Sequence, residues 1–368
     1  MNTALKRTSL HGFHLDHGAR MVPFAGWEMP VQYTSILEEH LAVRQQAGLF
    51  DVSHMGQLRV HGPQAREFLD QILSCDIDRL YIGRAAYGIL CQDDGGCVDD
   101  IIVYQIEDEE FFLCVNAANR EKDFLWISRL ATGLDCRVDD VSDSFALLAL
   151  QGPIAIELFE KVTDHSLDGL KRFHATPLAC LDTRILVSRT GYTGEDGLEL
   201  YFPASEGPRV ANLIYESGKE AGLRLVGLGA RDSLRLEAGF PLYGHELSEE
   251  IDLLTAGLGF AAKLETGKAF VGSQQLLKNL TEGLRQRVIH FILDDRRLPR
   301  PGYPVCDRDG TACGKVLSGA HSPVLGKPIG SALVDRTALD ERQPLAVAIR
   351  NDRVPLRVQR PPLHKAQG

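Results

Sequence analysis

The sequence has no long apolar run, no block of basic residues and no secretory signal. A helix needs about 18 apolar residues or more to cross a bilayer, so we expect no membrane partner. The opening segment, MNTALKRTSLHGF, lacks the apolar centre of an export signal. The formal net charge is −10, which argues against nucleic acid as the main partner. These absences favour a soluble protein of the cytoplasm.

Metal-binding and redox motifs are absent as well. The eight cysteines include no Cys-x-x-Cys pair, and the 12 histidines show no His-Glu-x-x-His or similar spacing. We therefore expect no metal site. Several cysteines stand inside apolar runs, as Cys114 does in FFLCV. Buried free thiols in a reducing compartment explain this pattern.

What is present is an ordinary globular composition. Of the 368 residues, 44% are hydrophobic and 24% are charged, which allows a large core. A chain of this length typically forms two or three domains. In the N-terminal part we expect an irregular segment at 23–30 and a helix at 35–47. In GLFDVSHMG, at 48–56, we expect a loop that leads into a strand at 57–61.

Two stretches of the chain repeat the same order of elements. LRVHGP at 58–63 leads from a predicted strand through Gly-Pro into a helix, and LALQGP at 148–153 does the same. Proline suits the first turn of a helix, because its missing amide would have no partner there. We match the hairpin at 86–92 and 98–106 in the first copy with the hairpin at 183–189 and 198–202 in the second. Helices at 119–130, capped by Asn119, and at 207–221 complete the two related α+β units.

The character of the sequence changes from about residue 285. Short strand-like runs at 288–293, 330–334, 345–349 and 355–358 are separated by clusters of Pro, Gly and Asp. This pattern is typical of a small all-β domain, either a barrel or a roll.

Three acids stand among apolar residues in predicted strands. Successive side chains of a strand point to opposite faces, so Asp99 and Asp100 in GGCVDDIIV lie on different faces, each beside β-branched neighbours. A carboxylate in such surroundings is unfavourable unless it is paired, hydrogen-bonded or functional. The pattern alone does not show whether Asp99 or Asp100 is the functional acid. In GLELY at 197–201, Glu199 shares a face with Tyr201, while Leu198 and Leu200 face the core.

Seven motifs together resemble a known family. They are PFAGWEMPVQY, GLFDVSHMG, GGCVDDIIVY, VNAANREKD, SRTGYTGEDGLEL, GLGARDSLRLEAG and SPVLGK. In this order, from about His11 to Val358, they resemble the aminomethyltransferases of the glycine cleavage system, the T proteins. The resemblance implies an α+β, three-domain, cloverleaf-like folate-binding fold, with two related α+β domains and a C-terminal β-barrel or roll around a central hole. We expect domains of 1–50 with 140–240, of 51–139 with 241–282, and of 283–368.

The resemblance also implies a reaction. The methylene of an aminomethyl group carried on the lipoyl arm of the H protein passes to tetrahydrofolate. The products are 5,10-methylenetetrahydrofolate, ammonia and dihydrolipoyl H protein. The lipoylated H protein is then the partner and tetrahydrofolate the co-substrate.

The resemblance assigns roles to individual residues. It makes Asp100 the catalytic carboxylate, which would stabilise the positive charge that develops on the one-carbon unit. The folate-binding positions are Glu199, Arg231, Tyr192, Asn116, Tyr104 and Tyr87. A carboxylate such as Glu199 can accept two parallel bonds from the pterin edge, and a guanidinium suits either the pterin carbonyl or the glutamate tail. We interpret His54 as mainly structural and Arg235 as an ion-pair partner of Asp232 or Glu237.

Some positions depart from the family pattern, and two other functions stay open. Ala320-His321 and the ending RPPLHKAQG differ from the usual residues, which leaves the contacts of the folate tail open.

A folate-dependent demethylase acting on a small methylated amine or sulfonium would use the same acceptor site. A non-enzymatic folate-binding protein is the third alternative, although PLYGHE at 241–246 lacks the cysteine of that class. The sequence has no Gly-x-Gly-x-x-Gly motif, so we do not expect the class that is fused to a flavin-dependent amine oxidase.

Overall fold

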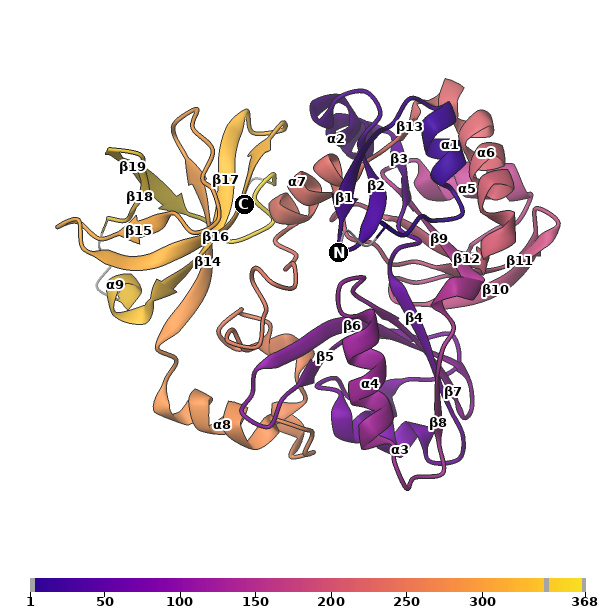
Figure 1. Ribbon diagram of the computed structural model, residues 1–368, viewed down its shortest axis with the longest axis horizontal. Helices are drawn as coiled ribbons and strands as arrows, with labels where there is room; N and C mark the ends of the chain where they lie inside the picture. Colours follow the sequence, from indigo (N-terminus) through magenta and orange to yellow (C-terminus); the bar gives the residue numbers. More distant parts are fainter. Residues whose placement is uncertain (1–3, 341–343, 366–368) are drawn as a thin grey trace. The chain divides into compact units, whose positions relative to one another are not determined.

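The computed structural model describes residues 4–340 and 344–365 (Figure 1). They form two compact units. The first contains the described residues up to Leu69 together with Ile77–Tyr87 and Ile101–Arg231. The second contains Asp70–Asp76, Gly88–Asp100 and the described residues from Asp232 onward. Within the described ranges, no helix is both long enough and apolar enough to cross a membrane.

A six-stranded sheet lies in the first unit. Its order is β10 (Ala175–Cys180), β11 (Thr183–Ser188), β12 (Gly197–Pro203), β9 (Phe145–Gln151), β3 (Ala47–Asp51) and β13 (Leu223–Leu225). All neighbours are antiparallel except β3 and β13, which run parallel. One face packs against α1 (His11–Asp16), α5 (Ala155–Thr163) and α6 (Gly207–Gly218). The core of this face includes Leu49, Leu148, Leu150, Leu198, Leu200, Phe159 and Ile214.

A second, five-stranded sheet has the order β5 (Ala85–Cys91), β6 (Cys97–Glu107), β7 (Glu110–Val115), β4 (Gly56–His61) and β8 (Arg137–Asp140). Helices α3 (Ala65–Ile72) and α4 (Arg120–Leu130) accompany it (Figure 1). Asn119 occupies the N-cap position of α4 as predicted, but its side chain makes no capping hydrogen bond. The predicted N-cap position of Asn119 is therefore confirmed.

The predicted internal repeat is visible in the order of elements. One copy runs β4, α3, β5, β6, β7, α4, β8, and the other runs β9, α5, β10, β11, β12, α6, β13. Gly62 and Gly152, which directly follow β4 and β9, share an unusual backbone, with φ of +122° and +132°. A Cβ at Gly62 would lie 2.8 Å from the carbonyl oxygen of Asp135, and one at Gly152 would overlap the carbonyl oxygen of Gln46. Both turns therefore require glycine.

The predicted match between the two hairpins is wrong by one strand. We missed β10, so we matched β5 and β6 with β11 and β12, whereas the sheet orders match them with β10 and β11. Reciprocal hydrogen bonds support this, because Ala85 N donates to Phe173 O (2.8 Å) and Ala175 N donates to Gly83 O (2.7 Å). The strands of Asp100 and Glu199 are therefore not equivalent in the repeat.

Two N-terminal predictions also need correction. GLFDVSHMG was predicted to be a loop, but its first residues belong to β3, which is buried throughout. A strand buried on both faces shows no polar alternation, which hid it. The segment predicted to be irregular forms a hairpin of β1 (Arg20–Phe24) and β2 (Trp27–Gln32). The predicted helix is confirmed as α2 (Ile36–Gln45), with Ser35 Oγ accepting a bond from Glu38 N (3.2 Å).

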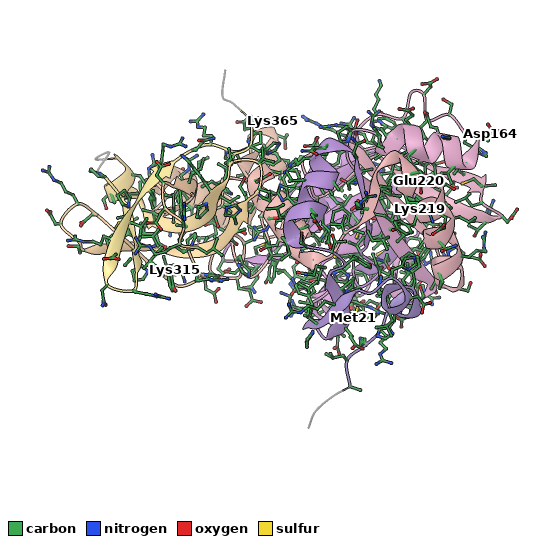
Figure 2. All side chains as sticks on the ribbon, turned by 90° about the horizontal axis from the view of Figure 1, so that it is seen from above. Met21, Asp164, Lys219, Glu220, Lys315 and Lys365 are labelled. Carbon is green, nitrogen blue, oxygen red and sulfur yellow. The ribbon has the colours of Figure 1, made fainter. Side chains whose placement is uncertain are left out.

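The predicted all-β region, in the second unit, is a closed barrel. Its order is β14 (Gln286–Leu293), β17 (Lys327–Asp335), β16 (Ala312–Ser322), β15 (Pro304–Cys306), β18 (Ala346–Ile349) and β19 (Asp352–Val358). We had not predicted β15 and β16. On β16, Lys315 points away from the barrel, whereas Val316 lies in its core (Figure 2). The other helices are α7 (Leu228–Ala238), α8 (Ser273–Glu282) and α9 (Arg336–Asp340).

Short 3-10 turns connect these elements. They are Ile77–Arg79, Ser142–Ser144, Ala204–Glu206, Lys219–Ala221, Gly259–Ala261 and Leu264–Thr266. All eight cysteines belong to the described residues, and all are free thiols. Seven are buried as predicted, and Cys136 is half-buried.

Candidate functional site

The face of the six-stranded sheet opposite its core carries Glu199. On β12, Leu198 and Leu200 belong to the apolar core, and the half-buried Glu199 lies between them on the other face. Tyr201 shares that face, as predicted. Ser188 on β11 is the direct cross-strand partner of Glu199. Side chains of paired residues lie on the same face, so a hydroxyl and a carboxylate are adjacent there.

A chain of hydroxyl groups ends on the Glu199 carboxylate. Thr190 Oγ1 donates to Glu199 Oε2 at 2.5 Å and lies 2.8 Å from Ser188 Oγ. The Tyr104 hydroxyl lies 3.3 Å from Thr190 Oγ1 and 3.2 Å from the Tyr201 hydroxyl. A threonine has one proton, so when it donates to the carboxylate, its hydroxyl neighbours must donate to it. The bonds therefore run from Tyr201 through Tyr104 and Thr190 to Glu199.

Burial governs the protonation of this chain. It raises the pKa of Glu199, while the bond from Thr190 and the charge of Arg231 oppose that rise. Burial also raises the pKa values of Tyr104 and Tyr201 above their ordinary range, so both phenols stay neutral. Neutral hydroxyl groups therefore hold one oxygen of the Glu199 carboxylate, Oε2, in place.

Arg231 and Tyr192 form a second part of the site. The guanidinium carbon of Arg231, on α7, lies 4.5 Å from the centre of the Tyr192 ring. Tyr192 stands in the turn between β11 and β12, close in sequence to Thr190. A guanidinium stacked on an aromatic ring is held in place. The structure thus brings together four of the predicted folate-site residues: Glu199, Tyr104, Arg231 and Tyr192.

The remaining predicted residues are placed as follows. Asp100 lies on β6, in the part of that strand that belongs to the second unit. Asp99 is fully buried and Asp100 is half-buried, which confirms that the two acids point to opposite faces. Tyr87 on β5 and Asn116, just after β7, are half-buried residues of the first unit. The roles of these residues stay predictions.

His54 is almost completely buried, with 2% of its surface exposed. Burial, and then the charge of Arg231, lower the pKa of His54 to about 4. The Phe24 ring meets it edge-on at 5.7 Å. Sequence reasoning treated His54 as structural and missed Ser188 and Thr190 altogether. The alternation that placed Glu199 could have revealed Ser188, since the two strands form one hairpin.

Comparison with known proteins identifies the family. Residues 10–266 match the family described as the GCVT N-terminal domain, and residues 285–365 match the glycine cleavage T-protein C-terminal barrel domain. The chain belongs to the glycine cleavage T-protein family. This T-protein chain is 45% identical over 364 residues to the aminomethyltransferase of Desulforamulus reducens, covering 99% of each chain. It is 46% identical over 346 residues to that of Moorella thermoacetica, covering 94% of each.

A solved T-protein structure has the same fold. The glycine cleavage system aminomethyltransferase T from Bartonella henselae is 32% identical, with a TM-score of 0.90 over 98% of each chain. The predicted family, the α+β fold with its C-terminal barrel and the predicted class of aminomethyltransferase are therefore confirmed.

Proposed function

We propose that this T-protein family member transfers the methylene group of an aminomethyl-lipoyl H protein to tetrahydrofolate. Two bonds from the methylene carbon to folate nitrogens form, and its bonds to sulfur and to the amine nitrogen break. The two protons of the folate nitrogens go to the sulfur and to the departing ammonia. The products are 5,10-methylenetetrahydrofolate, ammonia and dihydrolipoyl H protein. The eight free thiols support a reducing compartment, so we assign the reaction to the cytoplasm.

The Glu199 carboxylate carries this proposal. Thr190 fixes Oε2, and Glu199 is half-buried on the sheet face opposite the apolar core. Each carboxylate oxygen has two lone-pair sites, so Glu199 can accept two parallel N–H bonds from the aminopyrimidine edge of a pterin. Arg231, stacked on Tyr192, supplies donors for a pterin carbonyl or for the glutamate tail. Tyr104 acts here through the hydroxyl chain, and Tyr87 and Asn116 complete the proposed set.

We assign the chemical step to Asp100. As the sulfur–carbon bond loosens, positive charge develops on the one-carbon unit, and a fixed carboxylate stabilises that charge. Asp100→Asn keeps the shape of the side chain and removes its charge. We expect kcat to fall by roughly 10²–10³-fold, in line with the loss of one electrostatic group, and the affinity for tetrahydrofolate to change little. A variant with near wild-type turnover would remove Asp100 from the chemistry.

The test of the reaction is direct. The purified protein is incubated with aminomethylated H protein and tetrahydrofolate, and ammonia and 5,10-methylenetetrahydrofolate are measured. We expect both products in equal amounts. A protein that forms neither, yet consumes a methylated amine or sulfonium, would be a demethylase. A protein that binds tetrahydrofolate and converts no one-carbon donor would be a binding protein.

A further inference from the structure

The connection between β11 and β12, residues 189–196, carries two residues of the Glu199 site, Thr190 and Tyr192. Thr190 donates to the Glu199 carboxylate, and the Tyr192 ring carries the stacked guanidinium. In the other copy of the repeat, the equivalent strands β6 and β7 are joined by residues 108–109 alone. The long connection therefore belongs to one copy only, and the folded chain must hold it in one shape for both contacts to form.

Gln151, the last residue of β9, bonds to this connection through its side-chain amide. It is buried, with 1% of its surface exposed. Its Nε2 donates to Thr190 O (3.1 Å) and to Leu198 O (3.3 Å), and its Oε1 accepts a bond from Thr193 Oγ1 (3.0 Å). An amide offers two protons and one oxygen, and all of them are engaged here. The bonds to Thr190 and Thr193 lie on both sides of Tyr192 in the sequence.

The backbone around Gln151 leaves room for its amide only because two neighbours are glycines. A Cβ at Gly191 would overlap Gln151 Oε1, and one at Gly197 would lie 2.7 Å from its Nε2. In the other copy of the repeat, His61 stands at the equivalent position before the Gly-Pro pair, and its Nε2 lies 3.0 Å from Asp139 Oδ2 on β8. The buried amide therefore occurs only in the copy that has the long connection.

We propose that Gln151 is a positioning residue of the folate site, because its amide holds the connection in the shape that brings Thr190 to Glu199. This inference rests on the proposed function. Gln151 acts through the connection and touches no substrate. Without its amide, the connection must be ordered when tetrahydrofolate binds, and that ordering weakens the binding. The chemical step, which we assign to Asp100, does not depend on the amide.

Gln151→Leu tests this role, because leucine fills the buried space and makes no hydrogen bond. We expect the KM for tetrahydrofolate to rise about tenfold, as the loss of a buried hydrogen bond implies, and kcat to stay within about twofold of wild type. A folded variant with the wild-type KM would overturn the inference and leave the proposed function intact. A wild-type protein that does not use tetrahydrofolate would overturn both.

A double-mutant cycle distinguishes positioning from a general loosening of the fold. If Gln151 acts through Thr190, the two substitutions remove the same effect. In a Thr190→Val protein, Gln151→Leu should therefore raise the KM for tetrahydrofolate by no more than about threefold. A tenfold rise in both backgrounds would show that Gln151 does not act through the contact between Thr190 and Glu199, and would reject the inference.

The matched control is Gln64→Leu. Gln64 follows the Gly-Pro pair of the other copy, and its Oε1 accepts a bond from Asp135 N at 2.6 Å, in a connection that carries none of the proposed folate residues. We expect this variant to keep the wild-type KM, and an equal rise in KM would contradict a specific role of Gln151.

Thr193→Val covers the case in which Gln151→Leu fails to fold. It removes only the bond to Gln151 Oε1 and the bond from Glu195 N, which is 3.2 Å long. We expect the KM for tetrahydrofolate to rise about threefold, with kcat unchanged, since the amide then holds the connection at Thr190 alone. A wild-type KM in this variant would count against the inference in the same way.

Discussion

At the scale of single residues, the Glu199 carboxylate depends on a neighbour that sequence reasoning did not single out. Thr190 binds Oε2, and behind it stand the hydroxyls of Ser188, Tyr104 and Tyr201. A carboxylate fixed by a hydroxyl keeps one orientation, so a ligand that needs that orientation binds without ordering the side chain first. We therefore expect Thr190 to act as a positioning residue.

Thr190→Val tests this role, because valine has the same shape and no hydroxyl. We expect the Kd for tetrahydrofolate to rise about fivefold to tenfold, since the loosened carboxylate must be ordered on binding. Isothermal titration calorimetry measures the change. Thr190→Ser keeps the hydroxyl and should bind within about twofold of wild type. Equal affinities of the valine and serine variants would show that Thr190 does not position Glu199.

The buried imidazole of His54 predicts a pH dependence of stability. Its pKa is about 4 in the folded protein against an ordinary 6.5, so between these values the unfolded state binds the proton and the folded state does not. Stability therefore falls as the pH drops. For this one group, we expect a loss of about 2 kcal/mol between pH 7 and pH 5.

Urea unfolding of wild type and His54→Phe at the two pH values isolates this contribution. Acidification should destabilise the wild type more than the variant, because phenylalanine does not titrate. The charge of Arg231 lowers the pKa of His54 and that of Asp51 raises it, and both residues remain in the variant. A difference between the proteins that stays constant with pH would contradict a depressed pKa of His54.

At the scale of secondary structure, two glycines fix the equivalent strand-to-helix turns of the repeat. Gly62 N donates to Glu109 O (3.0 Å), and Gly152 N donates to Asp196 O (2.9 Å). Backbone atoms of Asp135 at Gly62 and of Gln46 at Gly152 approach so closely that neither site has room for a side chain. The Gly-Pro pairs in the sequence thus mark a backbone requirement that both copies have kept.

Gly152→Ala should destabilise the protein strongly. The new Cβ would overlap the carbonyl oxygen of Gln46, and φ is +132°. We expect a loss of about 3 kcal/mol or more in the free energy of unfolding, measured with guanidinium. Gly133→Ala is the control, because Gly133 has φ of +88° with open space around it, so it reports the backbone strain alone, about 1 kcal/mol. Similar losses in both variants would argue against the steric explanation.

The elements that could be predicted were those with a local signature. Amphipathic helices, the Gly-Pro turns and the alternating strand of Glu199 all follow from short-range pattern. Strand β3 could not be predicted, because a strand buried on both faces has no period. Strand β10 was missed because Pro177 interrupts its pattern. This error shifted the predicted match between the two hairpins by one strand. The contact of Thr190 with Glu199 depends on how strands pair, which a single sequence does not reveal.

At the scale of the whole molecule, a buried ion pair lies within the second unit, on the part of α7 that belongs to it. Arg235 is 1% exposed, and it donates to Glu246 Oε2 and to Ser318 Oγ, both at 2.8 Å. Burial raises the pKa of Glu246, but Arg235 and its other partners outweigh that effect and hold it below the ordinary value. The predicted pair with Asp232 also forms, at 2.8 Å. The pair with Glu246 was not predicted, nor was the bond to Ser318, which comes from a distant part of the sequence.

Arg235→Ala leaves the Glu246 carboxylate buried without its cation. We expect a loss of about 3–5 kcal/mol in the free energy of unfolding, measured by chemical denaturation at pH 7. The double variant Arg235→Met with Glu246→Leu should recover part of that loss, because no charge then remains buried. If the double variant loses the sum of the two single losses, the residues are not coupled.

The overall organisation was predicted in part. The family resemblance gave the reaction and the barrel, and the repeat gave two related sheets. The division into domains of 1–50 with 140–240, of 51–139 with 241–282, and of 283–368 stays a prediction. The catalytic assignment of Asp100 also stays one, because it rests on the motif alone.

The way the chain passes between its two units has a consequence for synthesis on the ribosome. Asp70–Asp76 and Gly88–Asp100 emerge early, yet they belong to a unit whose other residues begin at Asp232. Tertiary partners such as Val271, whose amide donates to Gln71 O at 2.9 Å, are translated about 200 residues later. The sheet partners of β5 and β6 are complete by Asp140, but these early segments must wait for their contacts with the rest of the second unit. Long-range contacts of this kind slow folding, so we expect the second unit to be completed only after the last third of the chain has been made.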